Sequence, residues 1–182
     1  MILIFESIIS EGFQNGLLVS GAYDFVIRTW SSSTWAQVSS FTGHTAGINA
    51  IVVMSSGLYI ASASDDTTIK IWNVTSGTVI YTLSNHTAAV FCLAVLNNGY
   101  LASGSLDNSI NIWNNNTGML VTKLTGHTGS VNSLVVLSNG LLVSASNDRT
   151  IKLWNVNTGA LQATLYNHSN AVNALAVLTN GL

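Results

Sequence analysis

Short runs of apolar residues alternate with turn-forming residues along most of this chain, at intervals of about ten residues. The stretch 127–167 shows four such runs, at Val131 to Leu137, Leu141 to Ser146, Ile151 to Val156 and Ala160 to Leu165. Asn, Asp, Ser and Gly, which favour turns, fill the gaps between them. No stretch keeps apolar residues at the three- and four-residue spacing of an amphipathic helix. The pattern therefore predicts an all-β chain of antiparallel, four-stranded meanders.

The same polar and aromatic residues return every 41 or 42 positions, which divides the chain into similar units. The recurring residues are Asp24, Asp66, Asp107 and Asp148; Trp30, Trp72, Trp113 and Trp154; and His44, His86, His127 and His168. A fixed period of about 40 residues predicts a repeat architecture in which each unit buries its apolar faces against its neighbours. The repeat region covers 1–182, with complete units at 44–85, 86–126 and 127–167 and partial units at 1–43 and 168–182.

Composition excludes several classes of function. The hydrophobic content of 48% allows a sizeable core, whereas charged residues make up only 7% and the net charge is −2. Because nucleic-acid backbones are bound by many clustered Lys and Arg, we expect no nucleic-acid partner.

The apolar start, Met1 to Ile9, is too short to span a bilayer and lacks the flanks of a signal peptide. We therefore expect a soluble, cytoplasmic protein without membrane association. The single cysteine, Cys92, lies in an apolar run, which predicts a buried and inert thiol.

Three segments resemble the WD-repeat (WD40-type) β-propeller family. Ile60 to Trp72 reads IASASDDTTIKIW and follows Thr42-Gly43-His44-Thr45, and Leu101 to Trp113 and Leu142 to Trp154 keep the same spacing. The resemblance covers nearly the whole chain and implies a β-propeller, with four-stranded antiparallel blades around a central channel. About four and a half repeats are present, so we expect an open arc or a fragment of a larger ring, which in this family most often has seven blades.

The resemblance implies a hydrogen-bonded tetrad of His, Ser, Asp and Trp in each complete unit. The implied tetrads are His44, Ser62, Asp66 and Trp72; His86, Ser103, Asp107 and Trp113; and His127, Ser144, Asp148 and Trp154. Ser20, Asp24 and Trp30 form a partial set without a His, and His168 stands without the other members. An indole only donates, a carboxylate only accepts, and an imidazole and a hydroxyl do both. The four groups can therefore satisfy one another inside an apolar blade.

Ser, His and Asp are also the components of a hydrolase triad. Here, however, the set recurs in every complete unit, always with a Trp, and without a nucleophile elbow or oxyanion glycines. We therefore interpret the tetrads as structural and expect no catalytic residue and no enzymatic activity. The histidines are 41 or 42 residues apart and lack the close Cys, His or acidic neighbours of a zinc site. Neither a metal site nor a cofactor is expected.

Details of the turns and of both ends depart from a regular repeat. One extra residue lies between Gly57 and Asp66, which predicts a bulge. The chain has no proline, and Asn98-Gly99 and Asn139-Gly140 occupy the turn where the family usually has one. Asn-Gly favours a tight hairpin because both residues tolerate positive φ.

Residues 3–9 and 168–182 each resemble only the first strand of a unit. An open arc would leave an apolar blade face exposed. We therefore expect a fragment of a longer chain or a truncated gene product. The alternatives are a closed four-blade ring, or self-association if the short chain is the natural product.

The resemblance places partners on the face that carries the turn between the second and third strands and the link into the first. The candidate partner-binding residues each directly precede the turn aspartate, and they are Tyr23, Asp65, Leu106 and Asn147. The favoured function is a non-catalytic scaffold that binds a protein or peptide through a propeller face. An alternative is a regulatory or substrate-receptor region of a larger effector, such as an immune-type ATPase or a ubiquitin-ligase receptor, whose active domain lies outside these residues.

Overall fold

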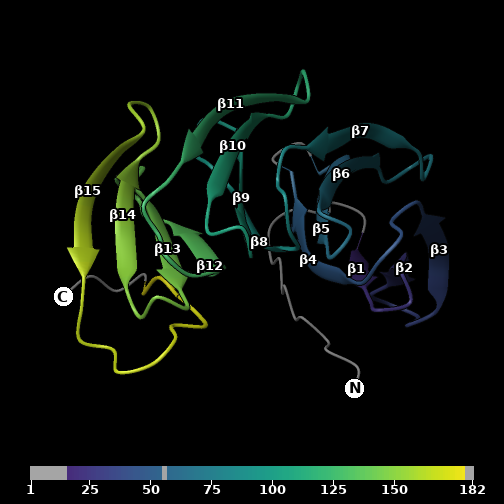
Figure 1. Ribbon diagram of the computed structural model, residues 1–182. Helices are drawn as coiled ribbons and strands as arrows, with labels where there is room; N and C mark the ends of the chain where they lie inside the picture. Colours follow the sequence, from purple (N-terminus) through teal and green to yellow (C-terminus); the bar gives the residue numbers. More distant parts are fainter. Residues whose placement is uncertain (1–15, 55–56, 179–182) are drawn as a thin grey trace.

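A computed structural model describes residues 16–54 and 57–178 of the 182-residue chain, and places fifteen strands in four antiparallel sheets (Figure 1). The first sheet holds β1 (Leu17–Gly21), β2 (Val26–Ser31) and β3 (Gln37–Thr42). The second holds β4 (Ile48–Val53), β5 (Tyr59–Ser64), β6 (Thr68–Asn73) and β7 (Val79–Ser84). The third holds β8 (Val90–Val95), β9 (Leu101–Ser105), β10 (Ile110–Asn114) and β11 (Met119–Leu124). The fourth holds β12 (Val131–Val136), β13 (Leu142–Ser146), β14 (Ile151–Asn155) and β15 (Ala160–Leu165).

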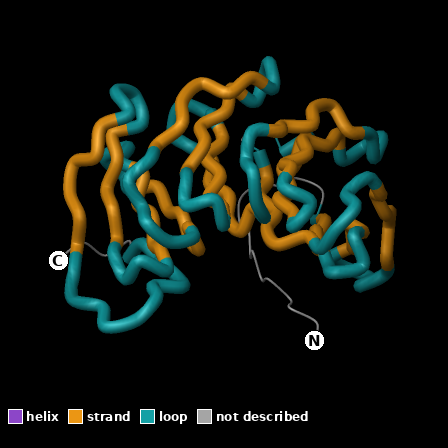
Figure 2. The backbone as a smooth tube through the Cα atoms, in the orientation of Figure 1, coloured by secondary structure: helices purple, strands orange, loops and turns teal. Residues whose placement is uncertain are grey.

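The four sheets stand side by side in an open arc, with β4, β8 and β12 toward the middle and β7, β11 and β15 outside (Figure 1). The inner strand β8 contacts both β4 and β12, and β1 contacts β4. Figure 2 shows that loops join the strands and that the described residues include no helix, hence no helix able to cross a membrane. The predicted all-β architecture of propeller blades in an open arc is confirmed.

The apolar core lies between neighbouring sheets, which explains why the units must stack. At one position of the outer strand, Phe41, Leu83 and Leu124 are only 1–3% exposed because the next sheet covers them. The equivalent Leu165 in β15 is 48% exposed, since no described sheet follows it. Burial of one such side chain contributes about 1.5–3 kcal/mol, so stacking stabilises each covered sheet substantially.

The hairpins between the first two strands turn at Asn98-Gly99 and Asn139-Gly140, as the sequence predicts. Gly99 and Gly140 have φ values of 83° and 84°, but Asn98 and Asn139 do not have positive φ. Instead, each Asn side chain accepts a hydrogen bond from the backbone N–H two residues later, at 3.0 and 3.1 Å. Asn-Gly takes the predicted turn, but this local side-chain bond closes it and leaves only glycine in the left-handed region.

The extra residue of the second sheet lies in a turn, so the predicted bulge was wrong. In the third sheet Tyr100 directly follows the turn glycine and closes the hairpin, whereas in the second sheet Leu58 comes between Gly57 and the closing Tyr59. The register shift between β4 and β5 recurs between β8 and β9 and between β12 and β13. The extra residue therefore does not cause that shift.

The sequence predicts a first strand at each end of the chain. The prediction for residues 3–9 lies outside the described residues. Residues 171–178 do not form the expected strand, although the Val172 amide donates to the Ser146 carbonyl at 3.0 Å and Val172 is only 6% exposed. A β-strand needs a partner for its backbone groups, and no second strand of this unit exists within the described residues.

Candidate functional site

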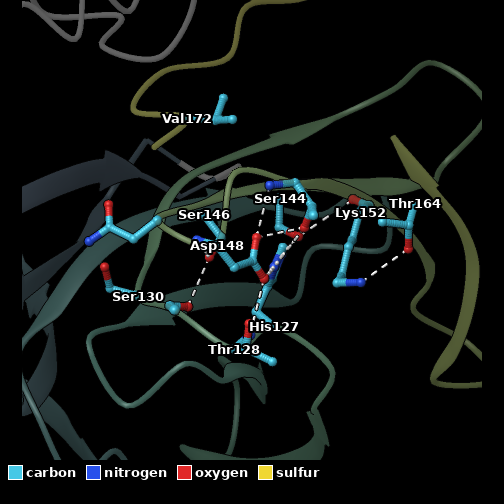
Figure 3. Close-up of polar contacts among 12 residues, drawn as sticks. His127, Thr128, Ser130, Ser144, Ser146, Asp148, Lys152, Thr164 and Val172 are labelled. Atoms are coloured by element: carbon cyan, nitrogen blue, oxygen red, sulfur yellow. Dashed lines mark hydrogen bonds and ion pairs between the residues drawn. The ribbon is translucent and has the colours of Figure 1, made fainter. Parts of the chain in front are cut away.

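Each four-stranded sheet brings its His, Ser, Asp and Trp into one hydrogen-bonded chain. In the fourth sheet, Trp154 Nε1 donates to Ser144 Oγ at 2.8 Å. His127 lies 2.7 Å from Ser144 Oγ through Nε2 and 2.7 Å from Asp148 Oδ2 through Nδ1 (Figure 3). The second sheet holds His44, Ser62, Asp66 and Trp72 at 2.7–2.8 Å, and the third holds His86, Ser103, Asp107 and Trp113 at 2.8–2.9 Å.

The order of donors and acceptors fixes the protonation of the imidazole. An indole can only donate, so the serine oxygen accepts from Trp and its own proton is directed to His Nε2. The neutral imidazole then carries its proton on Nδ1 and donates it to the aspartate, which only accepts. A backbone amide adds a second donor to the same carboxylate oxygen, as Thr128 N does for Asp148 at 3.0 Å. The buried polar groups of the tetrad therefore satisfy one another.

Burial and hydrogen bonding move the pKa values of the tetrad in a consistent direction. Burial lowers the pKa of His44, His86 and His127 below the ordinary value of 6.5, although the neighbouring aspartates partly oppose this. Burial alone would raise the pKa of Asp66 and Asp107, but hydrogen bonds from the turn hydroxyl, the backbone and the histidine outweigh it and lower both to about 2. The geometry thus favours a neutral imidazole beside an ionised carboxylate.

The tetrads contain the Ser, His and Asp side chains of a hydrolase triad, but the serines are not accessible to a substrate. Ser62, Ser103 and Ser144 are each 0% exposed, and each hydroxyl oxygen already accepts from an indole. Each tetrad lies within a different sheet, and no group of three or more potential metal ligands occurs in the described part of the chain. These sets support the sheets from inside and do not offer a substrate site.

The partial set of the first sheet finds a different partner for its aspartate. Trp30 Nε1 donates to Ser20 Oγ at 2.8 Å, as in the complete sets. Asp24, however, accepts from Arg28 Nη1 at 2.7 Å. At the other end, His168 is exposed and contacts no tetrad member among the described residues.

The four candidate partner-binding residues separate into two groups. Tyr23 and Leu106 are 60% and 49% exposed. Asp65 instead accepts a hydrogen bond from Asn49 at 2.6 Å, and Asn147 accepts one from Asn132 at 2.7 Å.

Asn49 also joins two neighbouring sheets, and Asn132 joins the fourth sheet to the segment that follows it. Asn49 Nδ2 reaches the Val90 carbonyl at 3.1 Å, and Asn132 Nδ2 reaches the Val172 carbonyl at 3.0 Å. Asp65 and Asn147 therefore hold, through a hydrogen bond within their own sheet, the asparagines that make these contacts.

The third sheet lacks this polar connection. Phe91 occupies the position of Asn49 and Asn132, and Leu106 occupies the position of Asp65 and Asn147. We call Phe91 and Leu106 together the Leu106 patch. Phe91 was missed by sequence reasoning, although the 41- to 42-residue period could have identified it as the exception among the inner strands. One polar pair has thus become apolar on the candidate partner face.

Comparison with known proteins agrees with the repeat. The WD40 family, described as WD domain, G-beta repeat, matches residues 35–73, 77–114 and 118–155. A Striatin homolog from Dictyostelium discoideum is 33% identical over 81 residues, which is 44% of this chain and 10% of that protein. A U3 small nucleolar RNA-associated protein 15 homolog from Xenopus laevis is 32% identical over 84 residues, which is 45% of this chain and 16% of that protein. The matched part is thus a small share of either relative's length.

Proposed function

The chain belongs to the WD40 family, and on this basis we propose that it is a non-catalytic scaffold that binds a protein or peptide through the face carrying Leu106. WD40 repeats generally act as protein-interaction scaffolds, and the buried tetrads are consistent with a structural role. Our proposal is that a protein or peptide partner exists and that it contacts the face carrying Leu106.

The single observation that carries this proposal is the Leu106 patch. An apolar side chain that is 49% exposed replaces a polar residue that elsewhere is hydrogen-bonded to an asparagine of its own sheet. Exposed apolar side chains gain favourable free energy when a partner removes them from water. The 60% exposed Tyr23 lies on the same kind of turn, and its ring lies against Gly47, where an added Cβ would be 2.7 Å away. Close packing of this ring limits its freedom, which lowers the entropy cost of binding.

Quantitative capture from cells that produce the protein tests the proposal. Leu106→Asp should lose the captured protein by about tenfold or more, because burial of an unpaired carboxylate is costly. Leu120→Asp is the matched control, since Leu120 is 37% exposed on the outer strand β11. Equal capture by both variants, each shown by circular dichroism to be folded, would contradict the proposal.

Nucleic acid is not a partner in this proposal. The cationic side chains are dispersed, with Arg28 in the first sheet, Lys70 in the second and Lys123 in the third. Arg28 is moreover paired with Asp24. A labelled single-stranded RNA should show no anisotropy change at physiological salt, because tight backbone binding needs several clustered cations. Salt-sensitive binding would overturn this part of the proposal.

The effector alternative, with a ubiquitin-ligase receptor or an immune-type ATPase outside this chain, stays a prediction.

A further inference from the structure

A pocket of about 400 Å³ lies between the second and third sheets. Its walls include Ile71, Ile80 and Tyr81, and its rim includes Asn98, Asn115 and Asn116. The rim residues come from the β8–β9 and β10–β11 turns. Because strands run antiparallel, these turns lie at the opposite ends of the strands from the turn that carries Leu106. The pocket and the Leu106 patch therefore belong to different faces.

Two residues at the junction between the second and third sheets differ from their equivalents in other units. Tyr81 stands where the other outer strands have Ser39, Thr122 and Ala163. Asn115 stands where the second and fourth sheets have Val74 and Val156, which pack against their core clusters. The junction thus has an aromatic wall in place of a small residue, and a polar rim in place of an apolar side chain.

The aromatic wall is held in a fixed position. The Tyr81 hydroxyl donates to the Asn116 carbonyl at 2.7 Å, which links the two sheets across the junction. Gly118 lies against the ring, where an added Cβ would be 2.8 Å from a ring carbon. Any larger residue at position 118 would displace the ring. Because both its hydroxyl and its ring are held, the Tyr81 side chain is preorganised for a ligand. It therefore loses little conformational entropy when a ligand binds.

The lining selects an uncharged occupant with an apolar group. None of the residues that line the pocket carries a charge, and Met54, Tyr59 and Ile71 provide apolar surface. The side-chain amides of Asn115 and Asn116 make no hydrogen bond within the described residues, so each can offer both donors and an acceptor. A peptide backbone needs this combination of partners. The wall residue Ile80 is 44% exposed, so an occupant continues onto the surface, as a side chain on a peptide does.

We propose that this pocket binds an apolar side chain of an uncharged peptide segment, with Asn115 and Asn116 bonding to the peptide backbone. The volume falls in the range of about 300–1,000 Å³ that is typical of ligand pockets. This site is additional to the Leu106 face and does not depend on it. Asn115→Val closes the pocket with the residue that the repeat itself uses at Val74 and Val156, so the variant should fold.

Selection from a phage-displayed library of random peptides on the full chain tests the proposal. We expect a class of uncharged peptides with a shared aliphatic or aromatic residue, whose Kd rises at least about tenfold for Asn115→Val. Tyr81→Thr, which introduces the residue of the neighbouring outer strand, should weaken the same peptides. The matched control is Asn157→Ser, at the position equivalent to Asn116 in the fourth sheet, and it should leave the Kd unchanged.

Leu106→Asp separates this proposal from the proposed function. Peptides that respond to Asn115→Val and not to Leu106→Asp support the pocket, whatever happens at the other face. Peptides that respond only to Leu106→Asp support the proposed function and overturn the pocket. Recovery of no peptide that distinguishes Asn115→Val from the wild type also overturns it, provided that circular dichroism shows both proteins folded.

Discussion

Arg28 Nη1 lies 2.7 Å from Asp24 Oδ2, in the place where the complete sheets hold a histidine against the turn aspartate. The two side chains are 30% and 49% exposed, whereas the histidine and aspartate of the fourth sheet are 1% and 7% exposed. The aspartate thus accepts a hydrogen bond in each case, from a charged guanidinium or from a neutral imidazole, but only the histidine connects it to the buried Ser and Trp. Because the two pairs differ in burial, we expect them to contribute differently to the free energy of unfolding.

Removal of each partner should therefore have very different effects on stability. Arg28→Gln should lower the free energy of unfolding by less than about 1 kcal/mol, because exposed ion pairs contribute little. His127→Ala should lower it by about 2–4 kcal/mol, because it creates a cavity and leaves buried polar groups unpaired. Urea unfolding of both variants measures the two values. Similar losses in the two variants would show that the tetrad has no special structural role.

Stability should fall with decreasing pH in two stages. Burial holds the pKa of His44, His86 and His127 below 6.5, so the unfolded chain binds protons first as the pH falls. This contribution is complete above pH 6.5 and is lost below it. The lowered pKa of Asp66 and Asp107, about 2 instead of 3.8, gives a second contribution that is lost as the pH falls from 3.8 towards 2. Urea unfolding from about pH 8 to pH 2 measures both stages; stability that rises on acidification would contradict this account of the tetrads.

The residue after the turn aspartate is strained in the second sheet. Thr67 has a φ of 71°, and its equivalent Asn108 has a φ of 67°. Asn tolerates this left-handed region better than a β-branched residue does. We expect Thr67→Asn to raise the free energy of unfolding by about 0.5–1 kcal/mol, and Asn108→Thr to lower it by a similar amount. Thermal and urea unfolding measure both, and effects of the same sign would exclude strain as the cause.

The Cys92 thiol should react only when the protein opens. It is 8% exposed, and burial raises its pKa to about 12 despite a hydrogen bond from the Gly104 backbone. Because the thiolate is the reactive form, an aromatic disulfide reagent should modify the native protein far more slowly than the urea-unfolded protein. Equal rates in both states would mean that the junction between the third and fourth sheets opens readily.

Periodicity predicted the repeat of four-stranded meanders, and the resemblance to the WD-repeat family implied the blades and the members of each tetrad, because all of these depend on the spacing of residues within a unit. Neither could show that Arg28 replaces a histidine, since that pairing depends on how the turn folds back. The turn at Asn98 was predicted, but its backbone conformation was not, because a local side-chain bond decides it. The pocket beside Tyr81 was not predicted either, because its residues come from two units and meet only when the sheets stack.

A photo-reactive side chain tests the proposed partner face most directly. Benzoylphenylalanine would replace Leu106 in one protein and Gln162, an exposed residue of the outer strand β15, in another. Irradiation in cells that produce the protein, followed by mass analysis of the adducts, reports which surface a partner touches. We expect one discrete adduct from position 106 and none from position 162. An adduct from position 162 alone, or from neither position, would contradict a scaffold that binds its partner through the Leu106 face.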